Sequence, residues 1–169
     1  MDEDADEKTQ VIFDALLDFA KVNNIKVSVG KVGIEGARGT SGGGEVKLLT
    51  NNISTLIHEL AHELLHWKED RDSFSKQVKE LQAEGVANVV LKEFGLPSEH
   101  TEKYLALWKV DADHITKNET VIRKIAEKII DYINDFATKD TVEPTPDEAA
   151  LPESLSKFDS IFQKIADKY

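Results

Sequence analysis

Residues 58–66, His-Glu-Leu-Ala-His-Glu-Leu-Leu-His, have the types and the spacing of a metal site. Residues four apart lie one above the other on a helix face, so His58 and His62 can offer two imidazole nitrogens to one metal ion. Glu59 is rotated by about 100° from His58, at ~3.6 residues per turn. From there its carboxylate can reach a water on the metal without itself binding the metal. This is the H-E-x-x-H arrangement of metal-assisted hydrolysis, with the glutamate as general base.

A catalytic zinc site takes three protein ligands besides its water. The chain has no cysteine, so the third ligand must be another histidine or a carboxylate. The segment Glu80-Leu-Gln-Ala-Glu84 offers two acids one helical turn apart, a single connection after the motif. Either acid can be the ligand, and the other would then accept the free N–H of a ligating imidazole.

Other polar side chains near the motif invite weaker assignments. His66 lies two turns beyond His58, ~12 Å along the axis at 1.5 Å per residue, which is too far to share the metal in a straight helix. We expect His66 at the helix end or at the rim of a cleft. The side chains that could stabilise an oxyanion opposite the metal are Tyr104, His100 and His114. For Tyr104, packing beside Trp108 is a competing interpretation.

The hydrophobic spacing predicts the elements that must position these residues. After a frayed acidic start, we expect a helix over 9–22, strands over 25–29, 32–34 and 45–49, the motif helix to about 67, and helices over 73–94, 99–108 and 119–136. The glycine-rich tract over 30–44 lacks the pattern of a phosphate-binding loop. It is better interpreted as a hairpin or a mobile flap over the cleft, and we expect strand 45–49 to offer an exposed edge to an extended substrate.

Composition excludes several function classes. The formal net charge is −11, which argues against direct nucleic-acid binding because such binding needs phosphate-neutralising Lys and Arg. No apolar run approaches the ~20 residues that span a membrane, and the acidic start is unlike a secretory signal. Without cysteine there are no disulfides. These features predict a cytoplasmic protein with neither a membrane nor a nucleic-acid partner.

The motif and the later acidic pair together resemble the gluzincin metallopeptidases, in which the third ligand is a glutamate. That resemblance implies Glu80 as the ligand and Glu84 as the support of a ligand histidine, with exchanged roles left open. Residues 58–66 and 80–87 are also similar to the H-E-L-x-H-x-L-L-H and E-x-x-A-[END]-x-x-A segments of the ImmA/IrrE and ArdC-like metallopeptidases. Residues 104–108, Tyr-Leu-Ala-Leu-Trp, resemble the ArdC-like Y-I-A-S-W segment, which favours Tyr104 as the oxyanion candidate.

The resemblance covers about residues 11 to 136 and implies an α+β, zincin-like domain with a small mixed or antiparallel sheet packed on several helices. We expect this domain over 1–137, a proline-rich acidic linker over 138–153 and an amphipathic helix over 154–169 that docks on the body or on a partner. The expected activity is zinc-dependent hydrolysis of a peptide or protein substrate with one Zn²⁺ ion. The resemblance further implies a regulatory protein of a mobile element or stress pathway as substrate.

Two other interpretations stay open at this point. In the first, the chain is a regulatory or protein-binding module with a zincin fold and little or no proteolytic activity. In the second, the peptidase is latent, and the tail folds over the cleft with acids such as Glu143, Asp147 or Glu148 near the metal.

Overall fold

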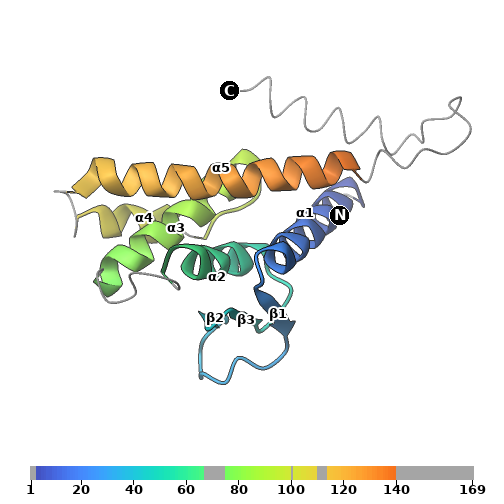
Figure 1. Cartoon of the computed structure of the whole chain (residues 1–169), viewed down its shortest axis with the longest axis horizontal. Helices are drawn as coiled ribbons and strands as arrows, with labels where there is room; N and C mark the ends of the chain where they lie inside the picture. The colour runs from blue at the N-terminus through green and yellow to red at the C-terminus, as the bar shows by residue number, and fades with distance from the viewer. Residues whose placement is uncertain (1–2, 67–74, 100, 110–113, 140–169) are drawn as a thin grey trace, which may run out of the picture.

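The computed structural model describes residues 3–66, 75–99, 101–109 and 114–139. In chain order its elements are α1 (Glu3–Val22), β1 (Lys26–Val29), β2 (Gly39–Gly42), β3 (Glu45–Leu48), α2 (Ile53–His66), α3 (Lys76–Glu93), α4 (Thr101–Trp108) and α5 (Ile115–Lys139). The fold is therefore α+β, helix-rich with one small sheet, as expected. Figure 1 shows the helices stacked on one side of that sheet, with α2 next to it and α5 farther away.

The three strands form a mixed sheet in the order β1-β3-β2. β1 runs parallel to β3, and β2 pairs with β3 antiparallel through a two-residue turn at Gly43 and Gly44. Both turn glycines have positive φ, 70° and 79°, as a tight hairpin turn requires. The expected hairpin is thus confirmed. The expectation that strand 45–49 offers an exposed edge is wrong, because β3 is the central strand and the edges are β1 and β2.

The short strand expected over 32–34 is also wrong. That segment is irregular, and the hairpin partner of β3 is the later stretch Gly39–Gly42. Gly33 and Gly36 have φ values of 78° and 79°, which no strand contains. The alternation of Val32 and Ile34 indicated a strand, but the backbone conformation of Gly33 between them is incompatible with one.

Helix α2 lies between the sheet and α3 and contacts both. Its start is capped by Asn52, whose side-chain oxygen accepts a hydrogen bond of 2.9 Å from the N–H of Thr55. Leu56 and Leu60 are fully buried in the hydrophobic core, as the pattern predicted, and Leu64 packs against that core. Burial of this stripe fixes the rotation of the helix and turns the three histidines towards α3.

Helix α3 is enclosed by α2, α4 and α5. It begins after Ser75, whose hydroxyl accepts from the N–H of Val78, and it ends at Glu93, two residues before Gly95 with its φ of 66°. All side chains from 81 to 88 are buried, including polar ones. Val89 is 38% exposed, because it occupies the face of α3 that the neighbouring helices leave open.

Two helices are longer than the sequence predicts. α1 starts at Glu3 rather than Thr9, since no Pro or Gly interrupts the chain before Thr9. α5 runs from Ile115 to Lys139, past the expected domain boundary at 137, because no Pro or Gly interrupts it. The rest of the expected linker and the helix over 154–169 lie outside the described residues. Within the described ranges, no helix is long and apolar enough to cross a membrane.

Candidate metal centre

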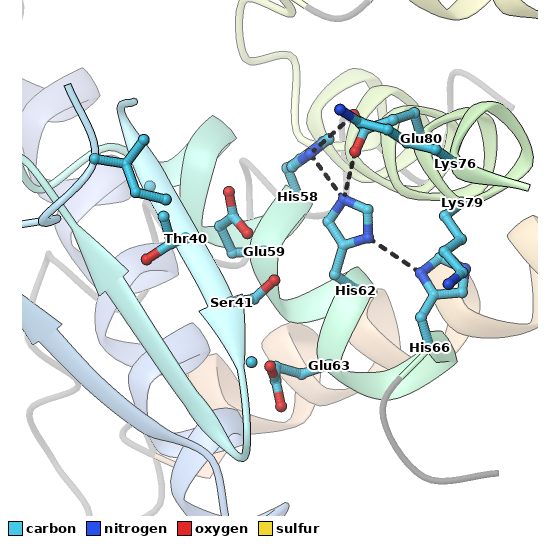
Figure 2. Close-up of a pocket in the computed structure, with 13 residues that line it drawn as sticks. Thr40, Ser41, His58, Glu59, His62, Glu63, His66, Lys76, Lys79 and Glu80 are labelled. Carbon is cyan, nitrogen blue, oxygen red and sulfur yellow. Dashed lines mark hydrogen bonds and ion pairs between the residues drawn. The ribbon is translucent and has the colours of Figure 1, made fainter. Parts of the chain in front are cut away.

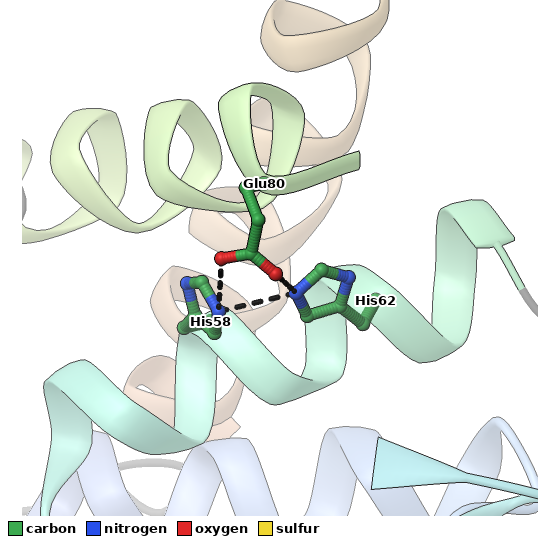
Figure 3. A group of neighbouring side chains, drawn as sticks. All are labelled: His58, His62 and Glu80. Carbon is green, nitrogen blue, oxygen red and sulfur yellow. Dashed lines mark hydrogen bonds and ion pairs between the residues drawn. The ribbon is translucent and has the colours of Figure 1, made fainter. Parts of the chain in front are cut away.

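His58, His62 and Glu80 converge on one point between α2 and α3 (Figure 3). The Nε2 atoms of the two histidines are 3.1 Å apart. Glu80 places Oε1 3.2 Å from Nε2 of His62 and Oε2 3.6 Å from Nε2 of His58. The structure thus brings together the two motif histidines and the glutamate that the resemblance implies.

These distances can be compared with the edge of a coordination tetrahedron. Zinc binds His nitrogen and carboxylate oxygen at ~2.0–2.2 Å, so two ligand atoms of a tetrahedral site lie about 3.3–3.6 Å apart. The three separations in the structure are 3.1, 3.2 and 3.6 Å. Two neutral imidazoles and one carboxylate are also a donor set that suits zinc. The residues present therefore fit a single divalent ion.

Glu80 is held in its charged form. Its hydrogen bond with His62 and the nearby charge of His58 outweigh burial and lower the pKa of Glu80 to about 2. The carboxylate is consequently anionic at every pH at which the imidazoles are neutral. A cation at this point would thus meet one negative charge and two imidazole nitrogens.

Glu59 lies next to His58 on α2 but turns towards the sheet, beside Thr40 and Ser41 of β2 (Figure 2). The side chain is 8% exposed, and burial raises its pKa, partly opposed by a hydrogen bond with Ser41. A raised pKa makes the carboxylate a stronger base. Glu59 therefore combines a position at the site with the proton affinity of a general base.

The hairpin is fixed to α2 by contacts that the sequence did not reveal. One turn beyond Glu59, Glu63 accepts a hydrogen bond of 3.0 Å from the backbone N–H of Gly44. A Cβ at Gly39 would lie only 2.6 Å from Cγ2 of Thr55 and 3.1 Å from Cγ of Glu59. Only glycine allows this approach, so β2 lies directly over the face of α2 that carries the two acids.

The converging ligands border two cavities. The larger, about 490 Å³, is lined by Ile34, Gly39, Thr40, Ser41, Gly42, His58, Glu59, His62, Glu63, His66, Lys76, Lys79 and Glu80. The smaller, about 270 Å³, shares Gly39, His58 and Glu59 with it. The two cavities thus meet at the motif, between the edge strand β2 and helix α3. A ligand seated there would contact both Glu59 and the side chains around Glu80.

Glu84 lies on the other side of His58 from Glu80. Its Oε1 is 3.7 Å from Nδ1 of His58 and 2.9 Å from Nζ of Lys103, and the side chain is almost fully buried. The hydrogen bond to Glu84 raises the pKa of Lys103. Glu84 therefore faces the nitrogen of His58 that points away from Glu80, the place expected for a supporting carboxylate. Lys103, on α4, was not singled out from the sequence.

His66 ends α2, as expected, and lines the larger cavity although its side chain is mostly buried. Its Nδ1 lies 3.1 Å from Nδ1 of His62, and its Nε2 lies 2.9 Å from Oε1 of Gln82. Burial lowers the pKa of His66 to about 4, so this imidazole is neutral at physiological pH. Gln82 was not predicted from the sequence, although a polar residue inside a buried helical stretch is a recognisable signal.

Among the described residues, Tyr104 and His114 line neither cavity. The Tyr104 ring packs against Trp108, with ring centroids 5.7 Å apart, and lies close to Gly85. Burial raises the pKa of Tyr104. The structure supports the packing interpretation of this tyrosine and does not bring it to the converging ligands. His114 is exposed at the start of α5, and His100 lies outside the described residues.

No protein-family model and no solved structure matches the chain. A Bacillus anthracis protein described as uncharacterized is 31% identical over 91 residues, which is 53% of this chain. The chain spans only 15% of the length of that relative. The likeness therefore assigns no activity to either protein.

Proposed function

We propose that this chain is a zinc-dependent peptidase of the gluzincin type, with a zincin-like fold and the ImmA/IrrE and ArdC-like metallopeptidases as its group. The observation that carries the proposal is the convergence of His58, His62 and Glu80, with contacts of 3.1, 3.2 and 3.6 Å between their nitrogen and oxygen atoms. Three acceptor atoms this close repel one another unless a cation or a proton lies between them. Helix α2 lies between the sheet and α3 and so brings these ligands together. This arrangement supports the proposed fold.

The residues divide the chemistry as follows. His58, His62 and Glu80 would hold the ion, which when bound supplies a Lewis acid that lowers the pKa of water and polarises a carbonyl. Glu59 accepts the proton of the attacking water and passes it to the leaving amine. The raised pKa of Glu59 suits both steps, because the same group must take up a proton and then release it.

The substrate would be an extended peptide or protein segment. β2 is an edge strand of the sheet and lines the larger cavity along Gly39–Gly42. A peptide lying along this edge could hydrogen-bond to the strand backbone while its scissile bond reaches Glu59. This replaces strand 45–49, which is central in the sheet and has no open edge.

Metal analysis of purified variants tests the ligand set. Wild type should retain a single zinc ion, and Glu80→Ala should lose it during dialysis. Glu84→Gln should weaken zinc binding by about 10- to 100-fold, the usual effect of losing a carboxylate that supports a ligand histidine. Loss of zinc in the Glu84 variant with retention in the Glu80 variant would show that the two acids have exchanged roles and would contradict the proposed ligand set.

Cleavage of a peptide library tests the reaction. Glu59→Gln should keep zinc and slow cleavage by about 10²- to 10⁴-fold, the contribution typical of a general base. The zinc content of that variant is its own control, because the change removes a proton acceptor and leaves the ligands in place. Cleavage by Glu59→Gln at the wild-type rate would refute the mechanism. A wild-type protein that binds zinc and cleaves nothing would favour the regulatory module.

A further inference from the structure

A row of buried polar side chains leads from the ligand His62 into the helical core. His66, Gln82 and Asn118 are 5%, 2% and 2% exposed and belong to α2, α3 and α5. Consecutive members are 3.1, 2.9 and 3.0 Å apart, counted from Nδ1 of His62. Buried polar groups are costly unless each finds a partner, so an unbroken row across three helices requires a physical reason.

The side-chain amide of Gln82 determines which atom donates in each hydrogen bond of this row. Nε2 of Gln82 donates to Oδ1 of Asn118, which leaves Oε1 of Gln82 to face Nε2 of His66. A carbonyl oxygen can only accept, so Nε2 of His66 carries the hydrogen. In a neutral His66 ring, Nδ1 is then an acceptor, and the hydrogen between the two histidines belongs to Nδ1 of His62.

We infer that Asn118, Gln82 and His66 form a positioning relay that sets the tautomer and the ring orientation of His62. With its hydrogen on Nδ1, His62 presents the lone pair of Nε2 to the point where Glu80 and His58 converge. Glu80 alone would favour the opposite tautomer, because its Oε1 lies 3.2 Å from Nε2 and would accept a hydrogen from it. The relay opposes that preference and keeps Nε2 available as a ligand.

The consequence for zinc rests on the proposed function, whereas the tautomer does not. Hydrogen bonds to the second nitrogen of a ligand histidine usually strengthen metal binding by about 10- to 100-fold. A merely structural network would also lower stability when broken. Loss of stability therefore does not distinguish the two roles, and the test needs a direct reading of the His62 ring.

The first measurement is the ¹⁵N spectrum of the imidazoles in metal-free protein, about two pH units above the ordinary imidazole pKa of ~6.5. His62 should hold its hydrogen on Nδ1 in wild type and should shift towards the Nε2 form in Gln82→Leu. His66→Gln should keep the wild-type tautomer, because its amide can accept from His62 and donate to Gln82, whereas His66→Leu should not. A wild-type His62 with its hydrogen on Nε2 would overturn the relay.

The second measurement is zinc affinity by competition with a chromogenic chelator. Gln82→Leu and Asn118→Leu should bind zinc about 10- to 100-fold more weakly than wild type. The matched control is Asn88→Leu, since Asn88 is a buried amide of α3 that accepts hydrogen bonds from Ser98 and Thr101, away from the ligands. Equal losses in Gln82→Leu and Asn88→Leu would overturn the relay.

These two measurements separate the proposals. Suppose that wild type binds zinc through His58 and His62 and that Gln82→Leu binds it equally well. That result contradicts the relay and leaves the proposed metal site intact. Wild-type protein that binds no zinc contradicts the proposed function, and the imidazole spectrum of the same sample still decides the tautomer.

Discussion

The close approach of β2 to α2 at Gly39 allows a sharp test of how the sheet positions the candidate base. An alanine Cβ there would lie 2.6 Å from Cγ2 of Thr55, about 1 Å inside the optimal carbon–carbon separation of ~3.5–4.0 Å. It would also lie 3.1 Å from Cγ and 3.3 Å from Oε1 of Glu59. Gly39→Ala should therefore push the hairpin and the Glu59 side chain apart.

The expected cost follows from two opposing effects. Overpacking of a tight contact costs ~1–3 kcal/mol, and replacing a strand glycine by alanine returns ~0.5–1 kcal/mol of backbone entropy. Gly42 is in the same strand, also lines the larger cavity, and would place its Cβ in open space. Neither glycine has positive φ, so alanine suits both backbones. Gly39→Ala should be less stable than Gly42→Ala by about 1–3 kcal/mol.

Urea unfolding, zinc content and peptide cleavage together check this prediction. Gly39→Ala should keep zinc, because the ligands lie on the face of α2 towards α3, and should cleave up to ~10²-fold more slowly through misplacement of Glu59. Thr55→Ser in the Gly39→Ala background removes Cγ2 and should restore most of the stability. Equal stability and equal cleavage in Gly39→Ala and Gly42→Ala would refute the reasoning.

Three further predictions follow from other contacts. The hydrogen bond to Asp18 raises the pKa of Tyr132 to about 12, so its contribution to stability is complete below the ordinary ~10 and is lost as pH rises towards 12. In Asp18→Asn, the phenolate absorbance of Tyr132 should titrate closer to ~10. In Gly85→Ala the new Cβ would lie 2.6 Å from Cδ1 of Ile122, so this variant should have a lower urea midpoint. The double variant with Ile122→Val should lose less unfolding free energy than the sum of the losses in the two single variants. Zinc at ~100 times its dissociation constant should stabilise the protein by about 2.7 kcal/mol, and thermal melts with chelator or with Glu80→Ala should show no such gain.

Much of the candidate site could be predicted because its spacing is local. His58, Glu59 and His62 follow from helical geometry alone, and Glu80 with Glu84 follows from the same rule one helix later.

The parts of the site and fold that the sequence did not predict depend on contacts between distant segments. Lys103 reaches Glu84 only because α4 packs on α3, and Gln82 meets Asn118 only because α5 does. Ser41 lies in a glycine-rich stretch without alternating apolar residues, so nothing in its neighbourhood predicted strand β2. Hydrophobic periodicity identifies which face of one helix is buried, but it does not say which helix covers that face.

Helix α3 shows how the site and the core share one element. A helix enclosed on three sides gains most stability from apolar side chains, yet its buried stretch includes Gln82, Glu84 and Asn88. Each hydrogen-bonds or ion-pairs with a residue on another element or on a following loop, so the cost of burying it is offset only while the fold is intact. Two of the three contact histidines of the motif. Replacing either of these two by an apolar residue of similar volume is therefore expected to weaken metal binding as well as stability, because it leaves the partners of the lost side chain unpaired and cannot orient an imidazole.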